Sequence, residues 1–478
     1  MQKLRLLIAC TAVLVATLVP LTASAVPPSA AQATATFEYT QNMHPLGYSA
    51  RIVETDNTLP GAGSFNSDLA FWGKTAVQGT YAGFRLIDVS APGNPKEIIN
   101  WEECNSLLNS QGNQGDVIIW EDLIIRSWNS PAPSSGSMCG DMPVAPGEEG
   151  VHIIDISNPT EPDVIGFVDI PCGSHTETLV PDLENDRLLV YSNSSANTIF
   201  GGTIPPDSPP TCRGIDIIEV PLDDPASASY LRFEPTGHED DPPENLHSCH
   251  DTGVILGDAN MVACAGQTSA TGGNGVTVFS LDPAMGGSKE NPMFLYHKTT
   301  GGISLGHSTS FTWDGEVIIV GHEPGGGSGA ECDPTDDPLE RTFFYVDADT
   351  GASIGQFTIP RLQTNLENCT THNYNVVPTD KRYVMVSGNY QSGISVIDFT
   401  DVANAKEIAY ADPAPLVDPN PPVGIELGGD WSSYWYNGHI YESDITRGLI
   451  IWDLSDKAVA GAQKLDHLNP QTQESTID

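Results

Sequence analysis

Residues 150–155 read Gly-Val-His-Ile-Ile-Asp, and this pattern of a glycine, four mostly apolar residues and an acid recurs along the chain. The clear copies are Gly83-Phe-Arg-Leu-Ile-Asp88, Gly214-Ile-Asp-Ile-Ile-Glu219, Gly393-Ile-Ser-Val-Ile-Asp398 and Gly448-Leu-Ile-Ile-Trp-Asp453; two degenerate copies are Gly275-Val-Thr-Val-Phe-Ser280 and Thr342-Phe-Phe-Tyr-Val-Asp347. β-Branched and aromatic residues favour strands, while the glycine tolerates a chain reversal and the acid can accept the N–H groups of a turn. Each copy therefore predicts a strand followed by a tight turn.

The repeats predict the architecture. Two shorter strand signals precede each copy, as in His250 to Leu256 and Met261 to Ala265, and a fourth follows, as in Asp163 to Val168. Four short strands per unit, seven units and no helical periodicity indicate an all-β fold, a seven-bladed β-propeller of four-stranded blades. The last unit lacks a fourth strand after Leu454, so we expect the N-terminal stretch from Tyr48 to Glu54 to supply it and close the ring.

The N-terminus has the pattern of an export signal. A short basic start precedes an apolar run from Leu6 to Val19, and Ala23-Ser24-Ala25 provides the small residues that a signal peptidase needs. No later run reaches the ~18 apolar residues of a membrane helix, so we expect a secreted protein, extracellular or periplasmic, without membrane insertion. The predicted divisions are a signal peptide over 1–25, an N-terminal tail over 26–45, the propeller as one domain over 46–457 and a C-terminal tail over 458–478.

The charge balance restricts the partners. The chain has 20 Lys and Arg against 62 Asp and Glu, so its formal charge is 20 − 62 = −42. A polyanion such as nucleic acid or an anionic membrane would be repelled. We expect a monomer whose partner is an extracellular ligand, protein or polysaccharide, and not nucleic acid.

The repeated strand resembles the signature of the LVIVD-repeat family. Leu86-Ile87-Asp88-Val89 and Ile153-Ile154-Asp155-Ile156 read much like that signature, and the resemblance covers roughly Ser64 to Asp456. It implies a secreted or surface-attached propeller. Members generally have no assigned reaction, so the resemblance carries no catalytic residues to this chain, and function has to be argued from the site itself.

Eight cysteines follow the predicted signal peptide. An even number in an oxidising compartment favours four disulfides, and the absence of a Cys-x-x-Cys pair argues against zinc-ribbon and thioredoxin-like sites. Six of the eight fall in loops on one face of the predicted propeller, where blades two, three and five carry insertions. Eight cysteines allow 105 pairings, of which we predict Cys104 with Cys139, Cys172 with Cys212, Cys249 with Cys264 and Cys332 with Cys369.

One kind of residue begins the first strand of every predicted blade. The aligned units place an Asp or a His there each time, namely Asp68, Asp116, His175, His250, His307, His372 and Asp430. Only 12 of the 478 residues are His, yet four of them occupy this column in consecutive blades. The first strand of a propeller blade lines the central channel, so the column predicts a ring around one channel mouth.

The ring suggests a metal site. Neutral imidazoles suit transition metals such as Cu, Zn, Fe or Mn, and three or four of them with an open position could activate water or oxygen. We predict His175, His250, His307 and His372 as ligands and Glu177 as the candidate general base. Supporting or alternative groups are Asp68, Asp116, Asp430, His322, Glu323, His247 and Asp251.

Other interpretations stay open at this point. The four histidines could serve a metal-dependent extracellular oxidoreductase or hydrolase, or the ring could only hydrogen-bond neighbouring blades in a metal-free surface or matrix adhesion module. Calcium could bind the acidic stretches 238–244 and 331–337 through carboxylates. Trp431 and Trp435, near the last ring position, could stack on a ligand.

Overall fold

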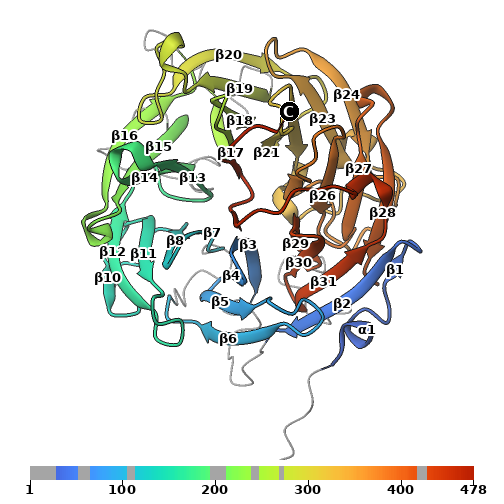
Figure 1. Ribbon diagram of the computed structural model, residues 1–478, viewed down its shortest axis with the longest axis horizontal. Coiled ribbons are helices and arrows are strands. Elements are labelled where there is room, and N and C mark those ends of the chain that lie inside the picture. The colour runs from blue at the N-terminus through green and yellow to red at the C-terminus, as the bar shows by residue number, and fades with distance from the viewer. Residues whose placement is uncertain are drawn as a thin grey trace, which may run out of the picture.

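The computed structural model describes residues 28–51, 65–104, 114–193, 212–237, 247–267, 274–416 and 428–477. Seven sheets stand around a central channel, each with four strands in antiparallel order from the channel to the rim, and three of the sheets include a fifth, short strand (Figure 1). The predicted all-β class and the seven blades are therefore confirmed. The predicted signal peptide and the acidic stretch 238–244 lie outside the described residues.

The first four blades follow one another in chain order. Blade one has β3 (Asn66–Trp72), β4 (Thr75–Thr80), β5 (Gly83–Asp88) and β6 (Lys96–Trp101). Blade two has β7 (Val117–Trp120), β8 (Leu123–Trp128), β11 (Gly150–Asp155) and β12 (Asp163–Asp169), with an inserted hairpin of β9 (Ser137–Cys139) and β10 (Met142–Val144). Blade three has β13 (Glu177–Asp182), β14 (Arg187–Asn193), β15 (Gly214–Pro221) and β16 (Ser229–Pro235); blade four has β17 (Ser248–Ile255), β18 (Met261–Gln267), β19 (Gly275–Ser280) and β20 (Met293–Thr299).

The last three blades complete the ring. Blade five has β21 (Gly306–Phe311), β22 (Val317–His322), β23 (Thr342–Asp347) and β24 (Ser353–Thr358). Blade six has β25 (Tyr374–Val376), β26 (Val384–Gly388), β27 (Ile394–Asp398) and β28 (Lys406–Asp412), and blade seven has β29 (Asp430–Tyr436), β30 (His439–Asp444) and β31 (Gly448–Leu454). The segments that the repeat predicted are the third strands of their blades.

The repeated glycine has a steric cause. A Cβ atom on Gly150 would lie 1.9 Å from the carbonyl oxygen of Val168 in the fourth strand, and one on Gly83 would lie 1.9 Å from that of Trp101. Because no side chain fits at these points, the close approach of the fourth strand requires glycine.

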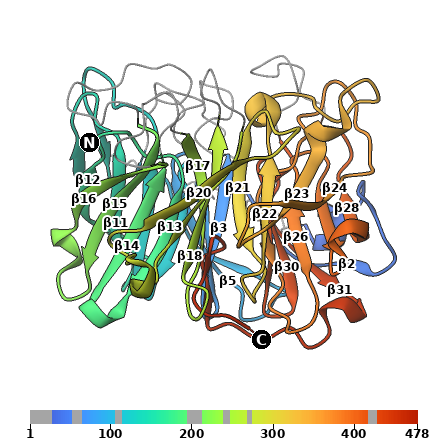
Figure 2. The ribbon, with the colours of Figure 1, turned by 90° about the horizontal axis from the view of Figure 1, so that it is seen from above.

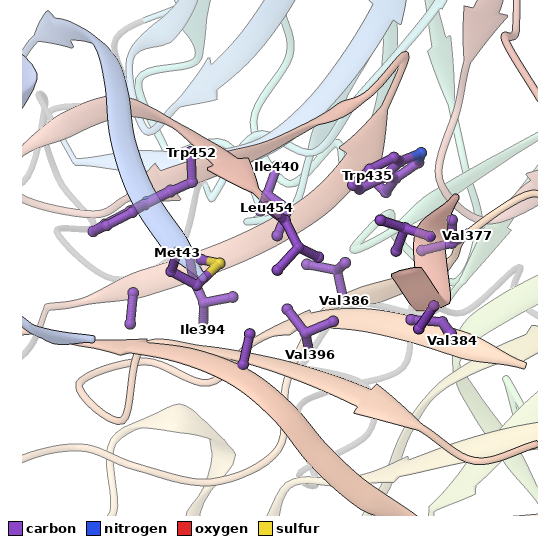
Figure 3. Packing of buried hydrophobic residues seen from close by; sticks show 14 of the residues in the cluster. Met43, Val377, Val384, Val386, Ile394, Val396, Trp435, Ile440, Trp452 and Leu454 are labelled. Carbon is purple, nitrogen blue, oxygen red and sulfur yellow. The ribbon is translucent and has the colours of Figure 1, made fainter. Parts of the chain in front are cut away.

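The ring closes through an N-terminal strand, as predicted, but at a different place. Strand β2 (Met43–Ala50) pairs antiparallel with β31, from Met43 opposite Leu454 to Ala50 opposite Gly448. Figure 3 shows the reason: the Met43 side chain lies in the core between blades six and seven, close to Trp452 and Leu454. The pairing therefore begins five residues before Tyr48, and 52–54 lie outside the described residues. Upstream of it, α1 (Ala30–Ala33) and β1 (Glu38–Tyr39), which pairs with β28, also belong to the fold.

The C-terminal residues are not a free tail. Strand β32 (His467–Leu468) pairs with the end of β3, and β33 (Thr472–Gln473) runs parallel to the end of β17. The ring residues stand at the beginning of the first strands, whereas this segment pairs with the ends of first strands. It therefore crosses the channel at the opposite mouth, and Figure 1 shows it passing over the centre of the ring. We call residues 463–477 the C-terminal strap.

All four predicted disulfides are confirmed, joining Cys104 to Cys139, Cys172 to Cys212, Cys249 to Cys264 and Cys332 to Cys369. Among the described residues, no helix has the length and apolar character needed to cross a membrane.

Candidate metal centre

The ring residues are presented to the channel by irregular strand starts. In blade four the pairing jumps from Cys249 to Thr252, and in blade five it jumps from Gly306 to Thr309. The skipped residues include His250 and His307. A bulge of this kind breaks the alternation of a strand and turns a side chain that would otherwise point elsewhere. Both imidazoles are thereby aimed into the channel.

The four predicted histidines come together in one row. The Nε2 atoms of His175 and His250 are 2.9 Å apart. The ring centroids of His250 and His307 are 4.1 Å apart, and those of His307 and His372 are 4.6 Å apart. Their side chains are buried, so four consecutive blades contribute a continuous series of imidazoles to one wall of the channel.

Glu323 joins this row from the end of blade five's second strand. Its Oε2 lies 3.5 Å from His307 Nε2, and its Oε1 lies 3.7 Å from His372 Nε2. The Tyr390 hydroxyl donates a hydrogen bond of 2.6 Å to Oε1. Ligand atoms of His250, His307 and Glu323 all lie within 4.8 Å of one another. Glu323, which the sequence suggested only as a supporting or alternative group, is therefore central to the geometry.

Burial sets the protonation of these groups. It lowers the pKa of His175 to about 4 and that of His372 to about 3, and it holds the pKa values of His250 and His307 well below the ordinary value. Neutral imidazole is the form that binds a metal. Burial raises the pKa of Glu323 to about 8, so this carboxyl lacks a positive partner that would stabilise its ionised form.

Hydrogen bonds to Nδ1 distinguish His372 from His175. His372 Nδ1 bonds to the carbonyl oxygen of Trp431, which makes Nδ1 the donor and leaves the Nε2 lone pair free toward Glu323. The Asn129 amide nitrogen lies 3.0 Å from His175 Nδ1, while its oxygen accepts the Gln114 N–H at 2.8 Å. Asn129 is thus the donor, and the His175 proton lies on Nε2, facing His250. In this arrangement the His250 Nε2 lone pair accepts the His175 proton, so an ion bound by that nitrogen would replace this hydrogen bond, whereas His372 is ready to act as a ligand.

The predicted single column divides into two rows. Asp68 Oδ1 accepts the N–H of the next residue at 2.8 Å, and Asp251 Oδ1 does the same at 2.9 Å. Asp68 therefore aligns with Asp251, one position after the histidine row, which corrects its place in our alignment. Asp116 lies on the cavity wall with them and accepts the Glu177 N–H at 2.6 Å. Burial raises the pKa of all three carboxyls, that of Asp251 to about 8.

Four other predicted residues point away from the channel. Each has its own partners, and none contributes to the cavity wall. The Glu177 carboxylate accepts the hydroxyls of Ser174 and Ser192; Asp430 accepts the Ser433 hydroxyl; His322 bonds to Leu339 and Ser304; and His247 stacks on His297. Glu177 is therefore not placed to act as a base in this cavity.

The two rows enclose a cavity of about 90 Å³. At roughly 15 Å³ per water this is room for about six waters, enough for an ion, its water ligands and a small molecule. Tyr390 and Trp431 add aromatic walls, and Gln471 reaches in from the C-terminal strap. The sequence marked Trp431 by its nearness to the ring; Tyr390 and Gln471 carried no such signal.

The described residues include two other groups of potential ligands, both outside the channel. Glu331, Asp336 and Glu340 bring carboxylate oxygens within 4.8 Å of one another, partly within the predicted acidic stretch 331–337. His152 lies close to Cys104 and Cys139, but that pair is a disulfide and offers no thiolate.

Comparison with known proteins agrees with the repeat. The model of the LVIVD repeat family matches residues 144–170, which contain the third and fourth strands of blade two. This chain is a seven-bladed β-propeller that contains an LVIVD repeat. No curated protein matches it.

Two solved structures are distantly similar to this propeller. A candidate 6-phosphogluconolactonase from Bacteroides uniformis is 11% identical, with a TM-score of 0.46, over 79% of this chain and 89% of its own. A protein from Lactobacillus plantarum is 12% identical, with a TM-score of 0.45, over 84% of this chain and 96% of its own. Both likenesses are too distant to bear on function.

Proposed function

We propose that this propeller binds a divalent transition metal ion through His250, His307 and Glu323, with His372 as a further ligand, and offers an open coordination position to a small molecule. The observation that carries the proposal is the convergence of these buried ligand atoms on one point of a cavity. Two ligands at metal distances of about 2.0–2.1 Å lie about 3.3–3.4 Å apart in a tetrahedral site. The 3.5 Å between His307 Nε2 and Glu323 Oε2 is close to that separation.

The donor set narrows the choice of metal. Two imidazoles and one carboxylate are the ligands of catalytic zinc sites and of non-haem iron sites, both of which keep positions open for water or substrate. Among Cu, Zn, Fe and Mn, this set therefore favours Zn²⁺ or Fe²⁺. With such an ion in place, activation of a bound water or of oxygen is the chemistry that the site could supply.

A purely structural ring is less well supported by the contacts. His372 does bond to the backbone of the next blade through Trp431, as an adhesion module would require. His307 Nδ1, by contrast, finds no hydrogen-bond partner among the described residues. A ring that served only to join neighbouring blades would give this nitrogen a partner in the next blade, as His372 has.

The surroundings of the site fit an extracellular protein. Four disulfides persist in an oxidising compartment, which supports secretion. The cavity is too small for a polysaccharide or a folded partner to enter, so such partners would meet only the loops around its mouth.

A titration with Co²⁺, which takes the place of Zn²⁺ and has visible absorption bands when bound by few ligands, tests the proposal. We expect one Co²⁺ per chain with absorption typical of four or five ligands, and at least a hundredfold weaker binding in His307→Ala and Glu323→Gln. His44→Ala is the matched control, because His44 is exposed on the outer strand β2. Binding that is equally strong in all variants would refute the site.

A further inference from the structure

The C-terminal strap contacts every blade of the propeller. It starts where the Gln463 N–H donates to the Pro378 carbonyl of blade six at 2.7 Å. It then bonds in turn to blades seven, one, two, three, four and five, through Asn437, Phe71, Ile119, Leu179, Val254 and Phe311. Because the strap contacts all seven blades in ring order, it lies across the whole channel mouth opposite the histidines.

The strap provides hydrogen-bond partners for backbone groups at the inner edges of the first strands. The Ile119 N–H donates to Asn469 Oδ1 at 2.8 Å, and the Asn469 amide nitrogen donates back to the Ile119 carbonyl at 2.9 Å. Gln473 forms the same reciprocal pair with Phe311 in blade five, at 3.2 and 3.0 Å. Edge strands present unpaired backbone groups, and these two side chains occupy them as a paired strand would.

The strap also forms the floor of the metal cavity. Gln471 lies between the two anchoring residues and contributes to the cavity wall. Its amide nitrogen donates to Asp68 Oδ2 at 3.2 Å, and the Tyr434 hydroxyl donates to the other oxygen of that carboxylate at 2.6 Å. The lower row of carboxylates is thus held in place from below.

We propose that the C-terminal strap is a seal locked by Asn469 and Gln473, which closes the far mouth of the channel and leaves the histidine-lined mouth as the route for exchange. The contacts of the strap alone support the closure of the far mouth. The statement about exchange of the metal rests on the proposed function. With the strap in place, a bound ion would leave through the mouth that the histidines line.

The test compares a double variant, Asn469→Ala with Gln473→Ala, with the matched control Gln463→Ala, whose side chain is exposed on the same strap. Hydrogen exchange is measured by mass spectrometry on full-length mature protein, and release of Co²⁺ to a chelator is followed by absorption. We expect at least tenfold faster exchange in peptides covering β7 and β21, and at least fivefold faster Co²⁺ release. The control should match the parent protein in both.

The outcomes separate the two proposals. Unchanged exchange in β7 and β21 overturns the seal. Faster exchange with unchanged Co²⁺ release overturns its role in closing the channel and reduces the strap to a stabilising element. If the parent protein binds no Co²⁺, the proposed metal function fails, and hydrogen exchange alone decides whether the strap closes the inner strands. Should the double variant not be secreted, Gln473→Ala alone gives the same comparison.

Discussion

Arg85 provides a quantitative test of how the ring is closed. Its guanidinium is 1% exposed and bonds to Glu97 at 2.7 Å, to Gln78 Oε1 at 2.6 Å, and to Ser49 Oγ and the Ala50 carbonyl at 2.8 Å each. These contacts join blade one to the end of the closing strand β2. Replacing Arg85 by Met keeps much of the apolar stem but leaves buried acceptors unpaired, so we expect a loss of about 3–5 kcal/mol.

The matched control for this change is Arg382→Met. Arg382 bonds to Asp398 at 3.2 Å, but its side chain is 41% exposed, so the pair contributes about 0–1 kcal/mol. For about 450 residues the unfolding entropy is about 1 kcal/mol per kelvin, and the expected drop in Tm is thus about 3–5 °C for Arg85→Met and at most about 1 °C for the control. Calorimetry under oxidising conditions at one scan rate measures both. Equal Tm values for the two variants would refute this account of the closure.

Three further predictions concern stability away from the metal site. Burial raises the pKa of Asp216 to about 7, so the folded state holds a proton that the unfolded state loses above pH 4; stability should fall by about 4 kcal/mol as the pH rises from 4 to 7, and Asp216→Asn should remove that part of the slope in denaturation curves. Gly150→Ala should cost about 1–3 kcal/mol because its Cβ meets a carbonyl oxygen at 1.9 Å, whereas Gly301→Ala, with nothing within 4 Å, should be neutral in the same assay. Replacing Cys172 and Cys212 by Ser should cost about 4 kcal/mol, since their disulfide closes a loop of 40 residues; an unchanged denaturation midpoint would contradict this.

The fold was predictable because the same strand pattern recurs seven times in the sequence. Six of the seven third strands begin at or directly after a glycine that the neighbouring carbonyl requires, and blade five has Thr342 there. The histidines recur in consecutive blades because the first strands occupy equivalent places around one channel. Three of the four disulfide pairs followed from the loops that share one face, whereas Cys249 and Cys264 lie on adjacent strands of blade four. All of these features depend on position within a repeat, which a single sequence shows.

What could not be predicted depends on contacts that break the repeat. Strands β3 and β17 both begin with a bulge that skips two residues, and Asp68 and Asp251 are each the second of these. Asp68 therefore aligns with Asp251 and not with His250, which spacing alone does not reveal. The strap has no repeated counterpart, and its partners in blades one to four are more than about 200 residues away in sequence. Glu177 was chosen for its nearness to His175 in sequence, and regular alternation would place both on one side of a strand. Strand β13 begins only at Glu177, however, and its carboxylate accepts the hydroxyls of Ser174 and Ser192 away from the cavity.

The most direct measurement of the central claim is the metal content of the protein, secreted natively and exposed to neither chelator nor a nickel column. Plasma mass spectrometry should find about one Zn or Fe per chain in the parent protein and in His44→Ala, and less than one tenth of that in the His250→Ala, His307→Ala double variant. Metal-free parent protein, with a double variant of unchanged stability, would contradict the account and leave the ring a structural feature of the propeller.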